Sequence, residues 1–202
     1  MGGDERLRLF LALRLPGDAL DEIEEWQAAQ LPSGVRVVER DHLHVTLAFL
    51  GSRPTEEVDT IVAALREAAA GAGKIRLRPT RYRETRSVGM LVLDDALGTA
   101  EAFAGDLHER LEQLGVYRRE PRPWLPHVTV ARWSGRRLAR ARQRAEAAAL
   151  PAPERDHRPP RLRPAPPPDR TFVPSDAAAY VSRLHAGGAR YAVLKSVALG
   201  GE

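Results

Sequence analysis

The 202 residues of this chain are enough for one domain with a substantial core, and the net charge of +4 with a pI near 9.9 permits a polyanionic partner without requiring one. Cysteine is absent, which excludes disulfides and thiolate metal sites and leads us to expect a reducing compartment. The first residues lack the apolar run of a signal peptide, and no stretch has the length of a membrane span, so we expect a cytoplasmic protein.

The first half of the chain mixes strand and helix patterns. Apolar and polar residues alternate over 8–14, which predicts a half-buried strand. Apolar residues at helical spacing follow over 18–31. We then expect a short strand at 35–38, a strong strand at 43–50, and a second helix with Thr55 as its N-cap.

The second half repeats this mixture. We expect paired strands at 75–85 and 88–93, a helix over 99–114 and a strand at 127–133. Near the end, a hairpin turn at Gly187-Gly188 joins strands at 178–184 and 189–199. The strands at 43–50 and 127–133 therefore each lie in a unit with an amphipathic helix, which indicates an internal duplication.

Between these regions, the segment 151–169 is rich in proline and arginine, and we predict a mobile or extended loop there, preceded by an exposed helix over 136–149. A solvated linker is the preferred interpretation over a basic clamp on a polyanion. Only Lys74 and Lys195 among the 31 basic residues are lysines. GC-rich coding bias explains this excess of arginine at least as well as phosphate recognition by guanidinium groups.

One short pattern occurs twice: His44-Val45-Thr46-Leu47-Ala48 and His127-Val128-Thr129-Val130-Ala131. Because side chains alternate along a strand, each His shares a face with its Thr while the apolar residues face a core. Two such strands side by side would place two imidazoles and two hydroxyls in one cleft. One imidazole can give a proton while the other takes one, and the hydroxyls can donate to phosphate oxygens.

A metal site is the alternative interpretation of this region, with His42 and His44 as ligands on one strand face. A catalytic metal usually has three protein ligands, and the next position on that face is Thr46 rather than a carboxylate. We therefore expect no metal and no cofactor. The other histidines are interpreted as ordinary surface or satisfied core groups: His108, His157 and His185.

The paired motifs and their surroundings resemble the two-histidine (2H) phosphoesterases, and among them the RNA 2′,3′-cyclic phosphodiesterases, also called 2′-5′ RNA ligases. The matching segments are spread over nearly the whole chain, at 8–16, 43–51, 126–132, 180–184 and 188–194. The resemblance implies one α+β catalytic domain over 1–202. It also implies that two pseudo-symmetric lobes of antiparallel sheet, with outer helices, surround a central cleft.

The resemblance further implies hydrolysis of an RNA 2′,3′-cyclic phosphate to a 2′-phosphomonoester, with reverse 2′-5′ ligation as an accompanying expectation. By analogy His44 is the proton donor and His127 the proton acceptor, although the near-symmetry of the motifs does not distinguish these roles. Thr46 and Thr129 would bind the phosphate. The expected partner is RNA with 2′,3′-cyclic phosphate ends, tRNA halves included. We expect the protein itself to be a monomer with no membrane partner.

Four further residues are weighed. Arg132 follows the second motif where the family often has an arginine near the phosphate, but it reaches the site only if its strand ends or bulges there. Phe10 lies on the polar face of its strand and is a candidate for stacking on a base. Phe49 alternates with core residues and is expected to be core, and Ser182 is a weak site candidate.

Two alternatives to RNA hydrolysis stay open. The same site could act on a small cyclic nucleotide or an ADP-ribose cyclic phosphate. The chain could also be a catalytically idle RNA-binding module, although both motif histidines are intact. The proline- and arginine-rich segment departs from the family pattern and leaves substrate preference undecided.

Overall fold

The computed structural model describes residues 5–33, 35–133, 162–185 and 188–200. Its strands and helices follow the order expected from the sequence: β1 (Arg6–Arg14), α1 (Gly17–Gln30), β2 (Arg36–Val37), β3 (His44–Pro54), α2 (Val58–Ala70), β4 (Arg78–Glu84), β5 (Val88–Asp94), α3 (Thr99–Gln113), β6 (His127–Arg132), β7 (Asp176–His185) and β8 (Gly188–Val197). Two single 3₁₀ turns, η1 (Arg40–His42) and η2 (Thr55–Glu57), precede β3 and α2. The predicted helix over 136–149 lies outside the described residues.

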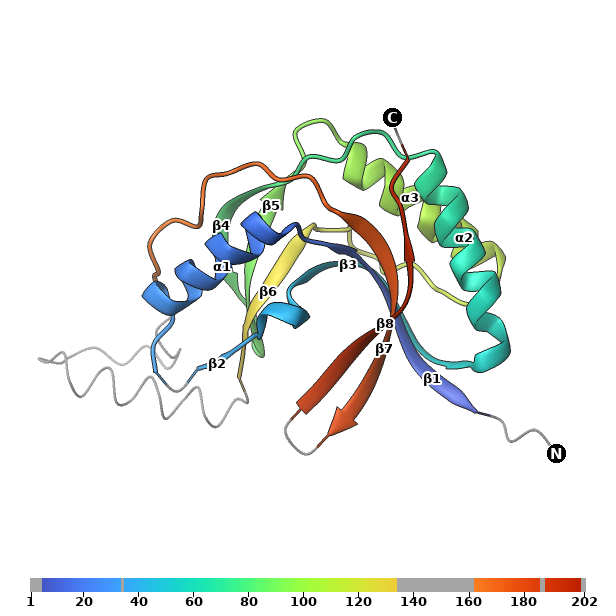
Figure 1. Ribbon diagram of the computed structural model, residues 1–202, viewed down its shortest axis with the longest axis horizontal. Helices are drawn as coiled ribbons and strands as arrows, with labels where there is room; N and C mark the ends of the chain where they lie inside the picture. Colours follow the sequence, from blue (N-terminus) through green and yellow to red (C-terminus); the bar gives the residue numbers. More distant parts are fainter. Residues whose placement is uncertain (1–4, 34, 134–161, 186–187, 201–202) are drawn as a thin grey trace, which may run out of the picture.

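The strands form one strongly curved antiparallel sheet in the order β4-β5-β6-β3-β1-β7-β8, with β2 paired to β6 (Figure 1). The sheet consists of two halves that meet where β3 pairs with β6. At this junction Val45 of β3 pairs with Val128 of β6. The arrangement confirms the expected α+β class. Each half of the sheet contains one of the two motif strands.

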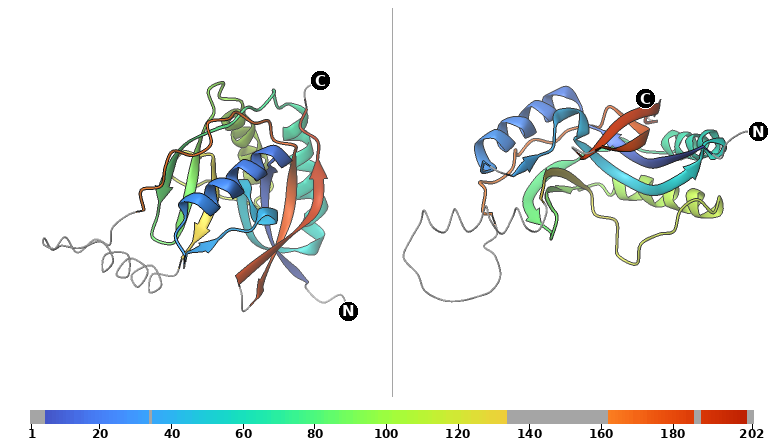
Figure 2. Two further views of the ribbon diagram at one scale, coloured as in Figure 1. Left: turned by 60° about the vertical axis from the view of Figure 1, so that its left-hand side comes forward. Right: turned by 90° about the horizontal axis from the view of Figure 1, so that it is seen from below.

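The three helices of the described residues pack on one face of the sheet. Figure 2 shows α1 along one half and α2 with α3 along the other. One continuous core joins buried side chains from these helices to those of the strands, among them Ile23, Leu65, Leu107, Leu11 and Val45. None of the helices in the described part of the chain is long and apolar enough to cross a membrane.

A β-bulge interrupts each motif strand at the same motif position. In the β1–β3 ladder Leu11 pairs with Ala48 and Ala12 with Thr46, so Leu47 is the extra residue. In the β5–β6 ladder Gly89 pairs with Ala131 and Met90 with Thr129, so Val130 is the extra residue. Both extra residues are buried, and a bulge changes which face the following side chain takes.

Buried side chains from two helices satisfy the carbonyl groups at these bulges. The ring Nε2 of His108 in α3 donates to the Leu47 carbonyl at 2.8 Å. The amide Nε2 of Gln27 in α1 donates to the Val130 carbonyl at 2.8 Å and to the Val38 carbonyl at 3.0 Å. Each half of the molecule thus supports the bulge of a motif strand in the same way, which agrees with the inferred duplication.

Two expectations are corrected or refined by the fold. Thr55 does not cap α2: it begins the η2 turn, its hydroxyl donates to the Glu5 carbonyl at 2.7 Å, and Glu57 occupies the N-cap position without a side-chain hydrogen bond. Part of the predicted mobile loop, residues 162–169, is extended and lies against neighbouring elements.

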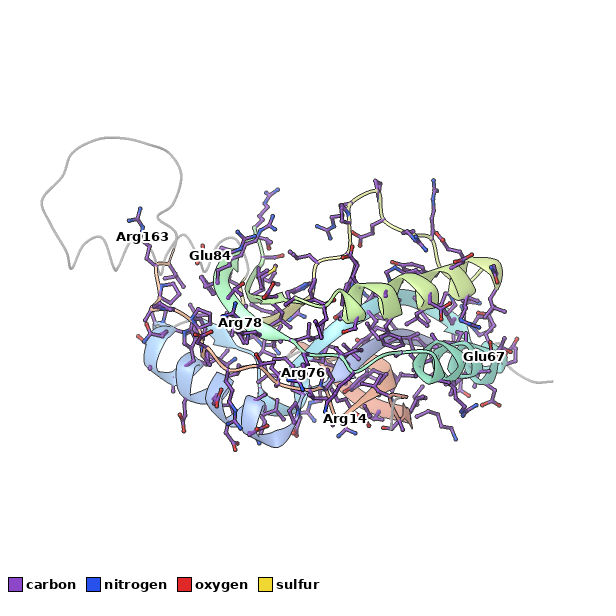
Figure 3. All side chains as sticks on the ribbon, turned by 90° about the horizontal axis from the view of Figure 1, so that it is seen from above. Arg14, Glu67, Arg76, Arg78, Glu84 and Arg163 are labelled. Atoms are coloured by element: carbon purple, nitrogen blue, oxygen red, sulfur yellow. The ribbon has the colours of Figure 1, made fainter. Side chains whose placement is uncertain are left out.

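Hydrogen bonds hold this extended segment in place. The Trp26 indole donates to the carbonyls of Ala165 and Pro166, and the Ala165 amide donates to Gln30. Arg78 of β4, which is labelled in Figure 3, pairs with Asp169 at the end of the segment, at 3.0 Å. Residues 151–161 lie outside the described residues, so mobility there stays a prediction.

We predict that Gln27→Leu lowers the free energy of unfolding by about 1–3 kcal/mol, because it removes the side-chain amide that donates to the Val38 and Val130 carbonyl groups, of which the Val130 carbonyl keeps the Val38 backbone amide as a donor. Urea unfolding measures the loss. Gln113→Leu, at an exposed position of α3, is the matched control and should change stability by less than about 0.5 kcal/mol. Equal effects of the two substitutions would contradict the role assigned to Gln27.

Candidate active site

The pairing of β3 with β6 brings the two motifs to one place. Continuing the register from Val45 and Val128 sets His44 opposite Thr129 and Thr46 opposite His127. Both valines are fully buried on the helix side of the sheet, so the four polar side chains lie on the other side. All four are half-buried, which leaves each of them accessible from the concave face.

His127 is held in a defined tautomer. Its Nδ1 lies 2.8 Å from the Leu125 carbonyl, which has no proton to give, so Nδ1 carries the hydrogen. In the neutral ring Nε2 is then an unprotonated acceptor. An imidazole in this state can take a proton from a water molecule.

His44 lies in a layer of aromatic rings. Its ring centroid is 4.9 Å from that of Phe10, 5.8 Å from that of Tyr180 and 5.6 Å from that of Tyr191, which meets it edge-on. The Nδ1 atom of His44 is buried and makes no hydrogen bond within the described residues. The two motif histidines therefore have different surroundings despite their matching sequences.

Burial in this layer lowers the pKa of His44 to about 4. The backbone of His42 acts in the opposite direction, while the positive charges of Arg132, His42 and His127 lower the pKa further. Arg132 and His127 therefore both lie close enough to His44 to act on it electrostatically. At neutral pH the His44 ring is therefore uncharged in the unliganded protein.

The bulge at Val130 brings Arg132 to the site face. Strict alternation places Arg132 on the face opposite to His127 and Thr129. The sequence allowed Arg132 to reach the site only if its strand ended or bulged there, and the strand does bulge. Its guanidinium Nη2 donates to the Tyr191 hydroxyl at 3.4 Å.

The equivalent bulge at Leu47 reverses the expectation for Phe49. This residue was predicted to be core, but it is 50% exposed on the same side as Thr46, and the Arg8 guanidinium lies 4.8 Å from its ring centroid. Phe49 and Arg132 thus occupy the same position of the duplicated motif. The error arose because strict alternation was carried across a bulge.

Base stacking on Phe10 is not supported in this structure. Phe10 is only 2% exposed, and its ring stacks on Tyr180 at 4.8 Å and meets Tyr191 edge-on at 5.0 Å. The face that looked polar in the sequence is covered by the β7–β8 hairpin. Phe10 therefore forms the floor beneath His44.

Sequence reasoning missed Tyr180 and Tyr191 as residues of the site. They come from β7 and β8, and their spacing contains no signal that they would meet β1 and β3. Ser182 is buried opposite Tyr191 in the β7–β8 ladder, so it supports this aromatic layer rather than opening to the cleft.

The alternative metal site receives no support from the donor set. Nε2 of His42 accepts a hydrogen bond from the Tyr191 amide at 3.4 Å. Among the described residues, no group of three or more His, Cys, Asp or Glu side chains is arranged to hold a metal ion.

Comparison with known proteins now places the chain. The family described as the 2′-5′ RNA ligase superfamily matches residues 15–161, more than half of the chain. The chain belongs to this superfamily. The matched range contains both motifs, and the resemblance expected from them is confirmed.

Three relatives carry the name RNA 2′,3′-cyclic phosphodiesterase. The one from Thermus thermophilus is 34% identical over 137 residues, covering 62% of this chain and 68% of its own. The one from Escherichia coli is 30% identical over 145 residues, covering 63% and 73%. The one from Methanocaldococcus jannaschii is 26% identical over 127 residues, covering 62% and 71%.

Solved structures share the fold over almost the full length. A Thermus thermophilus protein matches with a TM-score of 0.72 and 28% identity, covering 97% of this chain and 100% of its own. Escherichia coli LigT, solved with 3′-AMP, matches with a TM-score of 0.72 and 23% identity over 98% and 100%. The similarity to LigT shows the fold alone.

We predict that His44 makes the protein sensitive to acid. A histidine whose pKa is lower in the folded than in the unfolded chain stabilises the fold above the unfolded value of about 6.5, and this contribution is lost as the pH falls toward about 4. As the pH falls from 7 to 4, the free energy of unfolding of the wild type should therefore fall by roughly 3 kcal/mol more than that of His44→Gln. Urea unfolding at several pH values measures this, and a difference that does not change with pH would contradict it.

Proposed function

We propose that this protein hydrolyses the 2′,3′-cyclic phosphate at the end of an RNA chain to a 2′-phosphomonoester, without a metal ion. The observation that carries the proposal is the Val45–Val128 register, which puts two His-Thr pairs on one accessible face. The names of the three relatives, all RNA 2′,3′-cyclic phosphodiesterases, support the substrate.

The proposed step is an in-line displacement at phosphorus. His127 Nε2 takes a proton from water, the water oxygen attacks phosphorus, and the bond from phosphorus to the 3′-oxygen breaks. His44 gives a proton to that leaving 3′-oxygen. When the 5′-hydroxyl of a second RNA chain replaces water as the nucleophile, it gives its proton to His127 and attacks phosphorus, and the bond to the 3′-oxygen breaks as before. This opens the cyclic phosphate to a 2′-5′ phosphodiester, which accounts for the expected 2′-5′ ligation.

Thr46, Thr129 and Arg132 are assigned to the non-bridging phosphate oxygens. Negative charge develops on these oxygens as water attacks, and donors fixed in a partly dry site stabilise that charge more than water does. The terminal base is assigned to Phe49 instead of Phe10, because Phe49 has an exposed ring on the site face beside Arg8.

The acid role of His44 requires that substrate change its protonation. Its pKa of about 4 leaves the free ring neutral at pH 7, whereas a proton donor must be charged. An anionic phosphate beside the ring favours the imidazolium, so binding raises the pKa of His44. Substrate thus creates the proton donor that its own cleavage needs.

We predict that the protein, incubated with EDTA and an oligonucleotide ending in a 2′,3′-cyclic phosphate, releases a 2′-phosphate product. His44→Ala and His127→Ala should each lower kcat by about 10²–10⁴-fold, the usual contribution of a positioned acid or base, while substrate binding survives. Binding without turnover by the wild type would favour an idle module. Turnover abolished by EDTA would favour a metal site.

We predict that NMR titration of the His44 ring gives a pKa of about 4 in the free protein and a higher value with a nucleoside 2′-monophosphate bound. The spectrum of His44→Ala assigns the resonance. A His44 pKa unchanged by the ligand would contradict the acid role and make His44 the better candidate for the base.

A further inference from the structure

A cavity of about 130 Å³ adjoins the site at the end of β6, lined by Arg36, Arg132, His42, Tyr191 and Glu39 with neighbouring apolar groups. About 10–15 Å³ of such space holds one water molecule, so the cavity has room for several waters or for one small anionic group. None of the four motif side chains lines it, so it is a separate subsite that shares Arg132 with the active site.

Arg36 and Arg132 are directly opposite one another in the β2–β6 ladder. Like charges in this arrangement repel and destabilise the pair unless an anion lies between them. Within the described residues neither guanidinium has a carboxylate partner, although Arg132 donates to the Tyr191 hydroxyl. Glu39 is the one acidic residue lining the cavity, so the two arginines leave it with a net positive charge.

The cavity and Phe49 lie at opposite ends of the four motif side chains. Along the β3–β6 pair, Phe49 lies beyond the Thr46–His127 end of the motif residues and Arg132 lies beyond the His44–Thr129 end. With the terminal base on Phe49 and its cyclic phosphate among the histidines, Arg132 and Arg36 remain for the nucleotide on the 5′ side.

We propose that this cavity binds the phosphodiester group that precedes the terminal nucleotide, and that it makes an RNA end a better substrate than a mononucleotide. The inference rests on the proposed function, since it assumes that the cyclic phosphate binds between His44 and His127. It separates RNA from the small cyclic nucleotides that the sequence left open as substrates.

Kinetics with three substrates test the subsite: a nucleoside 2′,3′-cyclic phosphate, a dinucleotide ending in the same group, and that dinucleotide with an uncharged methylphosphonate linkage. Wild-type kcat/KM should be highest for the charged dinucleotide. Arg36→Gln should lower the ratio of kcat/KM for the charged dinucleotide to that for the mononucleotide about tenfold, as expected for one charge-assisted contact at a partly exposed site. The methylphosphonate ratio should change much less.

Arg66→Gln is the matched control, because Arg66 is exposed on α2, away from the cavity, and should leave both ratios within about twofold. The charged dinucleotide should also show the steeper loss of kcat/KM with salt, and Arg36→Gln should reduce this dependence. If the wild type cleaves all three substrates and Arg36→Gln leaves their ratios unchanged, the subsite is wrong and the proposed function stands.

If the wild type cleaves none of the three, the proposed function fails, and binding then tests the cavity directly. The probes are a dinucleotide 3′-monophosphate and its methylphosphonate analogue, measured by calorimetry. Tighter binding of the charged probe that is lost in Arg36→Gln supports the subsite. Equal affinities of the two probes for the wild type would overturn it.

Discussion

The burial of Val45 against Val128 is the constraint on which the site depends. Both side chains are fully buried at the junction of the two half-sheets, and a fully buried valine contributes about 1.5–3 kcal/mol. Because side chains alternate, these valines require the adjacent histidines and threonines to face the concave side. A slip of one residue would bury the polar groups and expose the valines, so the hydrophobic core specifies the register of the polar site.

How much of the site could be predicted from the sequence depends on how local the determinant is. The motif strands and the faces of His44 and His127 followed from a five-residue alternation. The faces of Phe49 and Arg132 did not, because they depend on bulges whose carbonyl groups are satisfied by helix side chains, His108 and Gln27. Those partners are distant in sequence, and no periodicity within the strand reveals them.

The aromatic layer around His44 was unpredictable for a related reason. The sequence indicated the last two strands, but their place beside β1 is a property of strand order in the whole sheet. That placement covers Phe10 with Tyr180 and Tyr191, which converts a face with a polar-looking pattern into a second small core. A correct set of elements was therefore compatible with a wrong environment for Phe10.

The same layer gives different properties to two nearly identical motifs. The ring contacts of His44 have no counterpart at His127 in the described part of the chain, where the Leu125 carbonyl instead fixes the ring. Desolvation disfavours the charged form of His44 and also strengthens its attraction to any anion that enters, because water no longer screens the interaction. A pair of titratable groups whose environments differ in this way can divide acid and base roles between them. The repeated motif thus supplies two similar histidines, and they become inequivalent because the tyrosine rings of β7 and β8 contact His44 and, in the described part of the chain, make no such contact with His127.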